Sequence, residues 1–162
     1  MSAVVNATPL MALSVIDRLD LLPLVFETVL VPTAVYTEVV HSGHERPGIA
    51  MAVRERWLRV VSPALSPAVE PVLLGLDQGE LQVLLLAREI NADWVVIDEK
   101  LGRRVARAMR LPVKGTLGVL LAAHFAGRFP SEDCHRAVSA FTAAGIRLSP
   151  ALIEWFLNQL TR

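Results

Sequence analysis

The sequence predicts an α/β sandwich built on a parallel sheet. Short apolar runs recur along the chain and alternate with stretches of helical periodicity, which is the pattern of strands joined by helices. Two of these runs, Ala3–Val5 and Trp94–Ile97, contain no charged residue, as expected for strands buried on both faces of a sheet. Apolar residues make up 53% of the 162 residues, which suffices for the core of a single domain spanning residues 1–162.

The first half of the chain is expected to contain three strands. The first strand ends near Asn6, and a helix then begins with Thr8 as its N-cap and Pro9 at its first position. The elements expected next are a short helix over Leu21–Phe26, a strand over Thr28–Val31 ended by Pro32, a helix capped by Thr33, a loop over His41–Gly48, a helix over Met51–Trp57 and a strand over Leu58–Val61.

The second half begins with an irregular, proline-rich connection over residues 62–71. Asp77 and Glu80 then stand three residues apart, the spacing of a capping box, and predict a helix that runs to about Ile90. The elements expected after it are the strand ending at Ile97, a basic helix with the apolar stripe Leu101, Val105, Ala108 and Met109, a strand over Pro112–Lys114, a helix opened by Gly115 and Thr116, and C-terminal helices (within residues 130–162) over Glu132–Ala144 and Pro150–Leu160.

Side chains with an oxygen donor lie where apolar runs meet a turn or a helix, at Asn6, Glu38, Glu80 and Asp98. In an open parallel sheet the ligand crevice lies beyond the carboxyl ends of the strands, where Asn6 and Asp98 are expected. Carboxylates brought close together repel one another unless a cation lies between them. Mg²⁺ and Mn²⁺ prefer such oxygen ligands, and a pair of these ions can hold both reacting oxygens of a phosphodiester. The pattern therefore predicts metal-dependent chemistry on a negatively charged substrate.

Each of these residues also has a purely structural interpretation. Glu80 can complete a capping box with Asp77, and Glu38 can be a surface residue of its helix. Asn6 can cap a helix or turn the chain. Asp98 is the strongest candidate, because a buried strand rarely ends in a carboxylate. The GxSxG, P-loop and GxGxxG motifs are absent from the sequence, which argues against the common hydrolases, nucleoside triphosphatases and dinucleotide-binding enzymes.

Positive charge is concentrated in the segment after Asp98, although the chain as a whole has no net charge. A basic patch beside an acidic site suits the phosphates of a nucleic acid, although the same charges can form a solvated helix face. The backbone N–H groups that follow Gly115 can likewise meet a phosphate, or Thr116 can be a simple N-cap. The cations of this segment are Lys100, Arg103, Arg104, Arg107, Arg110 and Lys114.

Assembly and location are predicted from three further features. The helix around Leu152–Leu157 is apolar on most of its circumference, so it packs in the core or, the interpretation favoured here, forms a contact in a homodimer. The single cysteine, Cys134, excludes an internal disulfide and fits the reducing cytoplasm. The uncharged stretch Gly115–Gly127 is too short to cross a bilayer, so no association with a membrane is expected.

The ordered set of motifs resembles PIN-domain proteins, and most closely their poorly characterised VapC-like branch. The resemblance covers roughly residues 3 to 126, and each motif alone is weak. The segments that carry it are Val4–Leu10, Leu30–Pro32 leading to Val35–Glu38, Gly79–Glu80, Ile97–Asp98 followed by Gly102–Ala106, and Gly115–Gly118.

The resemblance implies a three-layer α/β/α sandwich with a short, mostly parallel sheet of four or five strands. It also implies a nuclease that cuts RNA with Mg²⁺ or Mn²⁺. Many members are toxins of toxin–antitoxin pairs, usually dimeric and silenced by a small partner protein. Asn6 departs from the family pattern, which usually has Asp at this position. Because an amide keeps one ligand oxygen but lacks the negative charge, metal affinity should be lower.

These implications lead to one main functional hypothesis and two alternatives. The main hypothesis is a metal-dependent endoribonuclease, the toxin of a toxin–antitoxin pair. The first alternative, suggested by Asn6, is a PIN-like module that has little or no activity and binds RNA or a partner protein. The second is a metal-dependent phosphatase. The resemblance assigns metal binding to Glu38, Glu80 and Asp98, with help from Asn6, and auxiliary roles to Thr8 and Glu99. We add Thr116 as an auxiliary residue. We also expect RNA contacts at Lys100, Arg103, Arg104 and Arg107.

Overall fold

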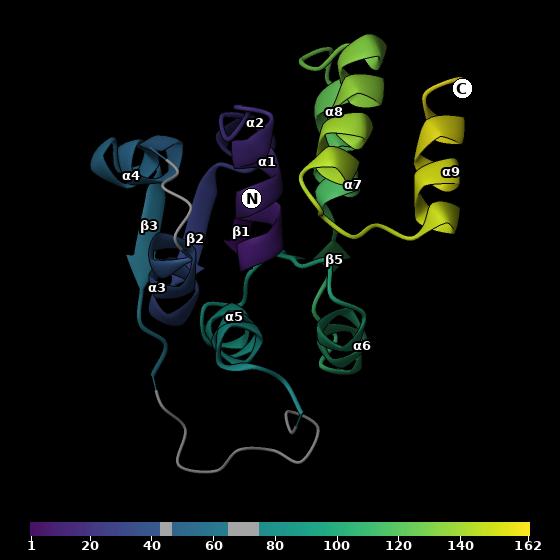
Figure 1. The fold of residues 1–162 in the computed structure, drawn as a ribbon. Coiled ribbons are helices and arrows are strands. Elements are labelled where there is room, and N and C mark those ends of the chain that lie inside the picture. Colours follow the sequence, from purple (N-terminus) through teal and green to yellow (C-terminus); the bar gives the residue numbers. More distant parts are fainter. Residues whose placement is uncertain (43–46, 65–74) are drawn as a thin grey trace.

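The computed structural model describes residues 1–42, 47–64 and 75–162. Five parallel strands form one sheet in the order β3-β2-β1-β4-β5, and helices cover both of its faces (Figure 1). The expected α/β/α sandwich is therefore confirmed, with a sheet that is parallel throughout. The strands are β1 (Ser2–Val5), β2 (Thr28–Pro32), β3 (Leu58–Val61), β4 (Trp94–Val96) and β5 (Val113–Lys114).

The helices form two layers around this sheet. One layer contains α5 and α6, and the other contains α1, α2, α4 and α7, with α8 packed against α1 and α7 (Figure 1). Helix α3 contacts both α1 and α5. The helices are α1 (Ala7–Val15), α2 (Leu21–Val25), α3 (Thr33–His41), α4 (Pro47–Arg54), α5 (Gln78–Glu89), α6 (Lys100–Ala108), α7 (Thr116–Phe125), α8 (Ser131–Ala143) and α9 (Pro150–Gln159).

The central strands are apolar because they are buried on both faces. Val4 and Val5 of β1 and Val95 and Val96 of β4 are all 0% exposed. The register pairs Val5 with Val96, and the backbone N–H of Asn6 donates to the Val96 carbonyl oxygen at 2.9 Å. The carboxyl ends of β1 and β4 are therefore level, which places the side chains after β1 next to those after β4.

Three threonines expected to open helices do not cap them. Helices α1, α3 and α7 have Asn6, Pro32 and Gly115 at the N-cap position. The threonines lie inside the first turn, and each hydroxyl bonds a residue far away in the sequence: Thr8 bonds Glu99, Thr33 bonds Ser62 and Thr116 bonds Asp98. The predicted caps were wrong because tertiary partners compete for these hydroxyl groups.

The buried face of α6 also differs from the prediction. Leu101, which was expected in the apolar stripe, is 42% exposed, and Ala108 is exposed as well. Gly102 and Ala106 are buried instead, beside Val105. The difference arises because α6 packs closely on the strand end, where a Cβ added at Gly102 would collide with the Ile97 side chain. The prediction used the spacing of large apolar residues, so it missed the small buried residues Gly102 and Ala106.

Two predicted connections fall partly outside the described residues. The loop expected over His41–Gly48 and the irregular connection over 62–71 include residues 43–46 and 65–71, which the structure does not describe. Helix α4 begins at Pro47, so it starts earlier and ends earlier than the helix expected over Met51–Trp57.

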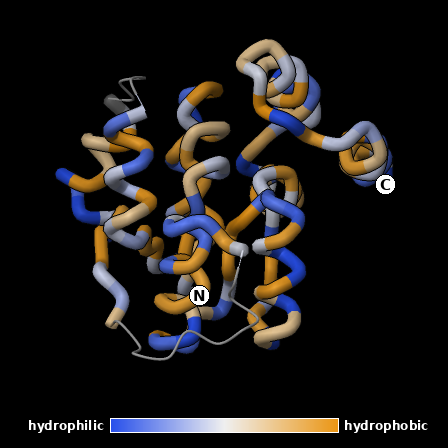
Figure 2. Tube along the Cα trace, turned by 60° about the horizontal axis from the view of Figure 1, so that its bottom comes forward, coloured by the Kyte–Doolittle hydropathy of each residue, from blue (hydrophilic) through white to orange (hydrophobic). Residues whose placement is uncertain are grey.

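The C-terminal helix α9 packs on α7 and stands away from the sheet (Figure 1). Phe156 is fully buried and anchors it, whereas Trp155 is 47% exposed. Hydrophobic residues run through the strands and the inner sides of the helices, and α9 carries both hydrophobic and hydrophilic residues (Figure 2). Within the described part of the chain, no helix has the length and apolar character needed to span a membrane.

Candidate functional site

Glu99 lies at the centre of a polar cluster at the carboxyl ends of β1 and β4. Its Oε2 accepts a hydrogen bond from Asn6 Nδ2 at 2.9 Å, and its Oε1 accepts one from the Thr8 hydroxyl at 2.5 Å. Asn6 is only 3% exposed, so its side chain is committed to this contact. Because Asn6 donates through its nitrogen, its amide oxygen remains available as a ligand.

Asp98, the residue before Glu99, is held by the first residue of α7. Its Oδ1 accepts the backbone N–H of Thr116 at 2.8 Å and its Oδ2 accepts the Thr116 hydroxyl at 2.5 Å. Burial raises the pKa of Asp98, although the two bonds from Thr116 and the charge of Arg103 oppose this shift. The carboxylate is thus fixed in position and partly desolvated.

Glu80 serves as the capping residue that the sequence suggested. Asp77 Oδ1 accepts the Glu80 N–H at 2.7 Å and Glu80 Oε2 accepts the Asp77 N–H at 3.0 Å, which completes a capping box at α5. Glu80 is 7% exposed. Burial is the main cause that raises its pKa, and the charges of Asp77, Glu99 and Glu38 raise it further. Glu80 therefore caps α5 and also carries charge next to the other acids.

Glu38 comes from α3 and reaches the start of α5. A Cβ added at Gly79 would lie 3.1 Å from Glu38 Oε2, so the glycine leaves room for this carboxylate. Burial raises the pKa of Glu38, followed by the charges of Asp77 and Glu99. The residue as a whole is exposed, so solvent screens much of this effect.

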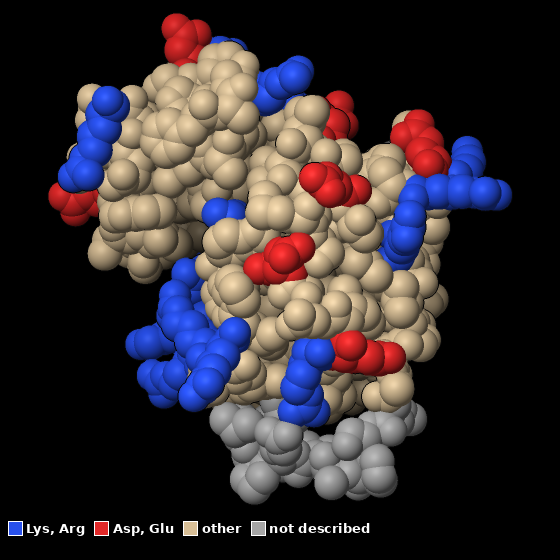
Figure 3. All heavy atoms as spheres, turned by 180° about the vertical axis from the view of Figure 1, so that it is seen from behind, with Lys and Arg blue, Asp and Glu red and all other residues tan. Residues whose placement is uncertain are grey.

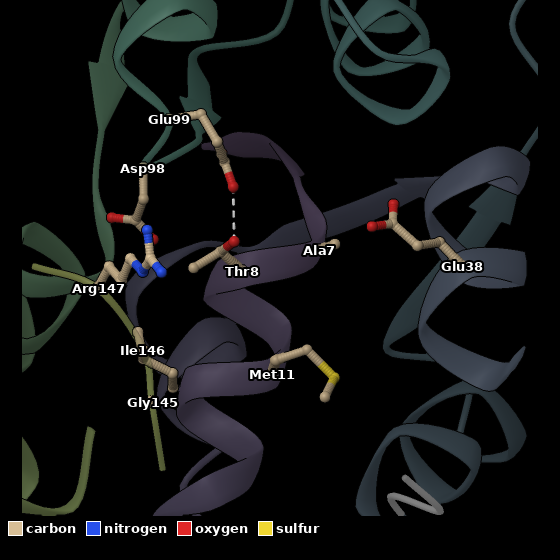
Figure 4. Close-up of a pocket in the computed structure, with 9 residues that line it drawn as sticks. All are labelled: Ala7, Thr8, Met11, Glu38, Asp98, Glu99, Gly145, Ile146 and Arg147. Atoms are coloured by element: carbon tan, nitrogen blue, oxygen red, sulfur yellow. Dashed lines mark hydrogen bonds between the residues drawn. The ribbon is translucent and has the colours of Figure 1, made fainter. Parts of the chain in front are cut away.

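These groups surround a cavity of about 380 Å³ that is lined by Thr8, Glu38, Asp98 and Glu99 among others. Figure 4 shows Asp98 and Arg147 on one side of it and Glu38 on the other, with Glu99 bonded to Thr8 between them. Of the predicted metal ligands, Glu38 and Asp98 line the cavity, whereas Asn6 and Glu80 are buried and are not among its lining residues. The part of the chain that is described contains no group of three His, Cys, Asp or Glu side chains already close enough to hold one ion.

Arg147 is a cavity residue that the sequence did not single out. It lies between α8 and α9, and the two residues before it, Gly145 and Ile146, also line the cavity. Within the described ranges Arg147 forms no ion pair. No sequence pattern marks it, because its position depends on how the C-terminal helices fold back toward β4.

The predicted RNA-binding cations lie on α6. Lys100, Arg104 and Arg107 are exposed, whereas Arg103 is half-buried and donates to the Ile97 carbonyl oxygen at 3.3 Å. Figure 3 shows Lys and Arg side chains gathered over this helix, beside a hollow below the C-terminal helices. The basic patch therefore lies next to Asp98, as expected from the sequence.

Comparison with known proteins identifies the family. A family model described as PIN domain (DUF3368) matches residues 2–162. The chain belongs to the PIN-domain family. This PIN-domain chain is also similar to the solved structure of a PilT N-terminus domain protein, SSO1118, from the hyperthermophilic archaeon Sulfolobus solfataricus P2, with 16% identity and a TM-score of 0.54 over 76% of this chain and 93% of that one. No curated protein sequence matches the chain.

PIN domains are generally nucleases and typically use divalent metals, and the acidic cavity of this PIN-domain chain fits such an ion. Its side-chain donors are the hard oxygens that Mg²⁺ and Mn²⁺ prefer. Burial is the main cause that raises the pKa of Glu38, Glu80 and Asp98, and a bound cation would favour the charged form of each carboxylate. Mg²⁺ often uses only one or two protein carboxylates and completes its coordination with water and phosphate. The scattered carboxylates are therefore compatible with binding.

Two substitutions at Glu80 should separate its capping role from its charge. Gln can accept the Asp77 N–H but carries no charge, so metal-free Glu80→Gln should be more stable than the native protein at neutral pH. The raised pKa means that native stability is complete while Glu80 is protonated and falls as pH rises through that pKa. The advantage of Glu80→Gln should therefore vanish below the ordinary carboxyl pKa, where Glu80 is protonated in both the folded and the unfolded protein.

Loss of the cap itself should show in Glu80→Ala. Both variants remove the charge, so this variant is expected to be about 1 kcal/mol less stable than Glu80→Gln across the pH range, since only its capping box is broken. Urea denaturation in EDTA from pH 4 to 8 measures both effects. If Glu80→Gln is no more stable than the native protein at pH 7, the charge of Glu80 costs nothing and the electrostatic interpretation is wrong.

Proposed function

We propose that this PIN-domain protein is a metal-dependent endoribonuclease. The observation that carries the proposal is the cavity at the carboxyl ends of β1 and β4, which Asp98, Glu99 and Glu38 line together, beside a basic helix. An acidic pocket attracts a cation and a neighbouring basic surface attracts polyanions, and a nuclease needs both. The chain has a nuclease-type fold, which supports the same conclusion.

Asp98, Glu99 and Glu38 would hold Mg²⁺ or Mn²⁺, with help from Glu80 and the amide oxygen of Asn6. When bound, the ion stabilises charge on the phosphoryl oxygens and lowers the pKa of water. The chain's own residues supply position: Thr116 fixes Asp98, and Asn6 and Thr8 fix Glu99. Lys100, Arg104 and Arg107 would hold the RNA backbone without reading its bases.

We further propose that the enzyme is the toxin of a toxin–antitoxin pair. In this proposal it acts in the cytoplasm as a homodimer and is silenced by a small partner protein. The VapC-like character of the sequence motifs and the buried, single Cys134, whose thiol pKa is raised to about 11 by burial, are consistent with it. Coexpression with the adjacent reading frame tests the pairing: relief of growth arrest by a small neighbouring protein is expected.

Asn6 favours one alternative, a PIN-like module that binds RNA or a protein without cutting. Its amide donates a hydrogen bond to Glu99, so this carboxylate has a partner without a bound ion. The module would bind RNA but leave it intact under all metal conditions.

Cleavage assays distinguish these functions. The native protein with labelled RNA and about 1 mM Mn²⁺ should cut the RNA internally, and EDTA should stop the reaction because the ion is removed. Exposed acids distant from the cavity offer a matched control: Glu132→Gln should cut at the native rate. Hydrolysis of a chromogenic phosphate ester without cleavage of RNA would instead support the phosphatase alternative, and RNA that is bound but stays intact in every metal would support the module.

A further inference from the structure

A second cavity, of about 160 Å³, adjoins the acidic site. Asp98 lines both cavities, so the second one begins where the proposed metal site ends. Its wall is built from α6, the segment of β5 that leads into α7, and α9. Its lining includes Arg103, Lys114, Gly115 and Trp155.

In the part of the chain that the structure describes, two cations of this cavity form no ion pair, although the Asp98 carboxylate lies close to one of them, Arg103. Arg103 and Lys114 are both half-buried, and burial is the main cause that lowers the pKa of each. Among the described residues, Arg103 donates only to the Ile97 carbonyl, and the Lys114 ammonium lies 4.2 Å from the centre of the Trp94 ring. Partly desolvated cations that form no ion pair are suited to an anionic ligand.

Gly115 keeps one of these cations next to Asp98. A Cβ at this position would lie 2.7 Å from Arg103 Nη1 and 2.9 Å from Asp98 Oδ1. The backbone of Gly115 has φ −91°, which any residue can adopt, so the reason for glycine here is space. The absence of a side chain allows the guanidinium and the carboxylate to flank one point at the mouth of the cavity.

The opposite wall offers an aromatic surface. Trp155 is 47% exposed, yet the next residue, Phe156, is fully buried and fixes α9 on α7. The indole is therefore held on a rigid helix and still open to solvent. An exposed aromatic ring beside basic side chains is the arrangement on which unpaired bases stack in proteins that bind single-stranded nucleic acids. Figure 3 shows the basic side chains of α6 bordering the hollow below the C-terminal helices.

We propose that this cavity is a subsite for one unpaired nucleotide of an RNA strand, with the base stacked on Trp155 and the phosphate held by Arg103 and Lys114. The proposal rests on the proposed nuclease function, because the subsite would align the neighbouring phosphate with Asp98. A duplex keeps its bases stacked and paired, so the subsite selects single-stranded RNA.

Binding assays without cleavage test the subsite. Fluorescence anisotropy of a short labelled RNA in EDTA and low salt should show that Trp155→Ala weakens binding about fivefold or more, the range for loss of one stacked base. Trp155→Phe should stay within about threefold of the native affinity, since it keeps a ring to stack on. Phe125→Ala removes an exposed aromatic side chain outside the cavity and should bind like the native protein. The same RNA as a duplex should bind more weakly and respond little to Trp155→Ala.

The phosphate contact has its own test. Lys114→Gln should reduce the slope of log affinity against log salt by about 0.7, as expected when one phosphate contact to a single strand is lost. Arg59→Gln, an equal change of charge on β3, should leave the slope unchanged because Arg59 is exposed and lies outside the cavity.

The outcomes separate the subsite from the nuclease. If Trp155→Ala binds single-stranded RNA like the native protein, the subsite is overturned, whatever the cleavage assays show. If Trp155→Ala only converts a dimer to a monomer in sedimentation and leaves RNA affinity unchanged, α9 is a contact between copies and the subsite is again overturned. If Trp155→Ala weakens binding but no RNA is ever cut, the subsite stands and the nuclease proposal fails.

Discussion

Asp98→Asn is expected to reduce Mn²⁺-dependent RNA cleavage by about 100-fold or more, because the variant removes a charged ligand oxygen from the proposed metal site. The fold should survive. Asn can accept the Thr116 N–H through its oxygen and donate to the Thr116 hydroxyl through its nitrogen, so both contacts can be kept. Cleavage rates and thermal unfolding of the same preparation measure the two effects.

The metal-free stability of this variant supplies the control. Because the pKa of Asp98 is raised in the folded protein, native stability falls as pH increases through that pKa. Asn has no proton to lose, so Asp98→Asn in EDTA at pH 7 should be at least as stable as the native protein. A variant that is stable and still cuts at the native rate would show that Asp98 has no part in the chemistry.

Asn6→Asp is expected to make the protein depend on metal for its stability. The amide now donates to Glu99 at 2.9 Å, and a carboxylate cannot replace that donor unless it is protonated. Two carboxylates at hydrogen-bond distance, one buried and one half-buried, cannot both ionise easily, so the pair should share a proton and have a raised pKa. At neutral pH and without metal, we expect a loss of about 3 kcal/mol, the scale for an uncompensated buried charge.

The pH dependence of Asn6→Asp follows from the direction of that shift. Stability is retained below the ordinary carboxyl pKa, where the pair is protonated, and is lost as pH rises through the raised pKa. Millimolar Mn²⁺ should restore stability at pH 7 and bind more tightly than to the native protein, because the variant regains a full ligand charge. Asn6→Ala is the matched control: it loses the same hydrogen bond without adding charge, so its deficit should not respond to pH or Mn²⁺. Equal behaviour of the two variants would contradict the proposed site.

Elements with a strong local signal could be predicted from the sequence. The apolar runs that became β1 and β4 identified buried parallel strands, and the Asp77–Glu80 spacing identified the capping box at α5. These signals work because burial and capping depend on residues close together in the chain. The positions of the cap residues of α1, α3 and α7 could not be predicted in the same way, because Thr8, Thr33 and Thr116 bond to partners in other elements.

The site was predictable in outline but not in its internal contacts. The sequence placed oxygen donors at the ends of β1 and β4, and the parallel register brings those ends together. The sequence predicted only an auxiliary role for Glu99. In the structure, Glu99 contacts Asn6, 93 residues away, and Thr8. Arg147 lines the first cavity and Trp155 the second because of how the C-terminal helices pack, and this packing cannot be predicted from a local sequence pattern.

Calorimetric titration of Mn²⁺ into the metal-free protein tests most directly whether the acidic side chains form a cation site. Saturable binding at millimolar metal or below is expected for the native protein and for Glu132→Gln, which removes an exposed acid on α8. Asp98→Asn should bind at least tenfold more weakly. Absence of binding at millimolar Mn²⁺, or equal binding by Asp98→Asn, would contradict the metal site on which the proposed nuclease function depends.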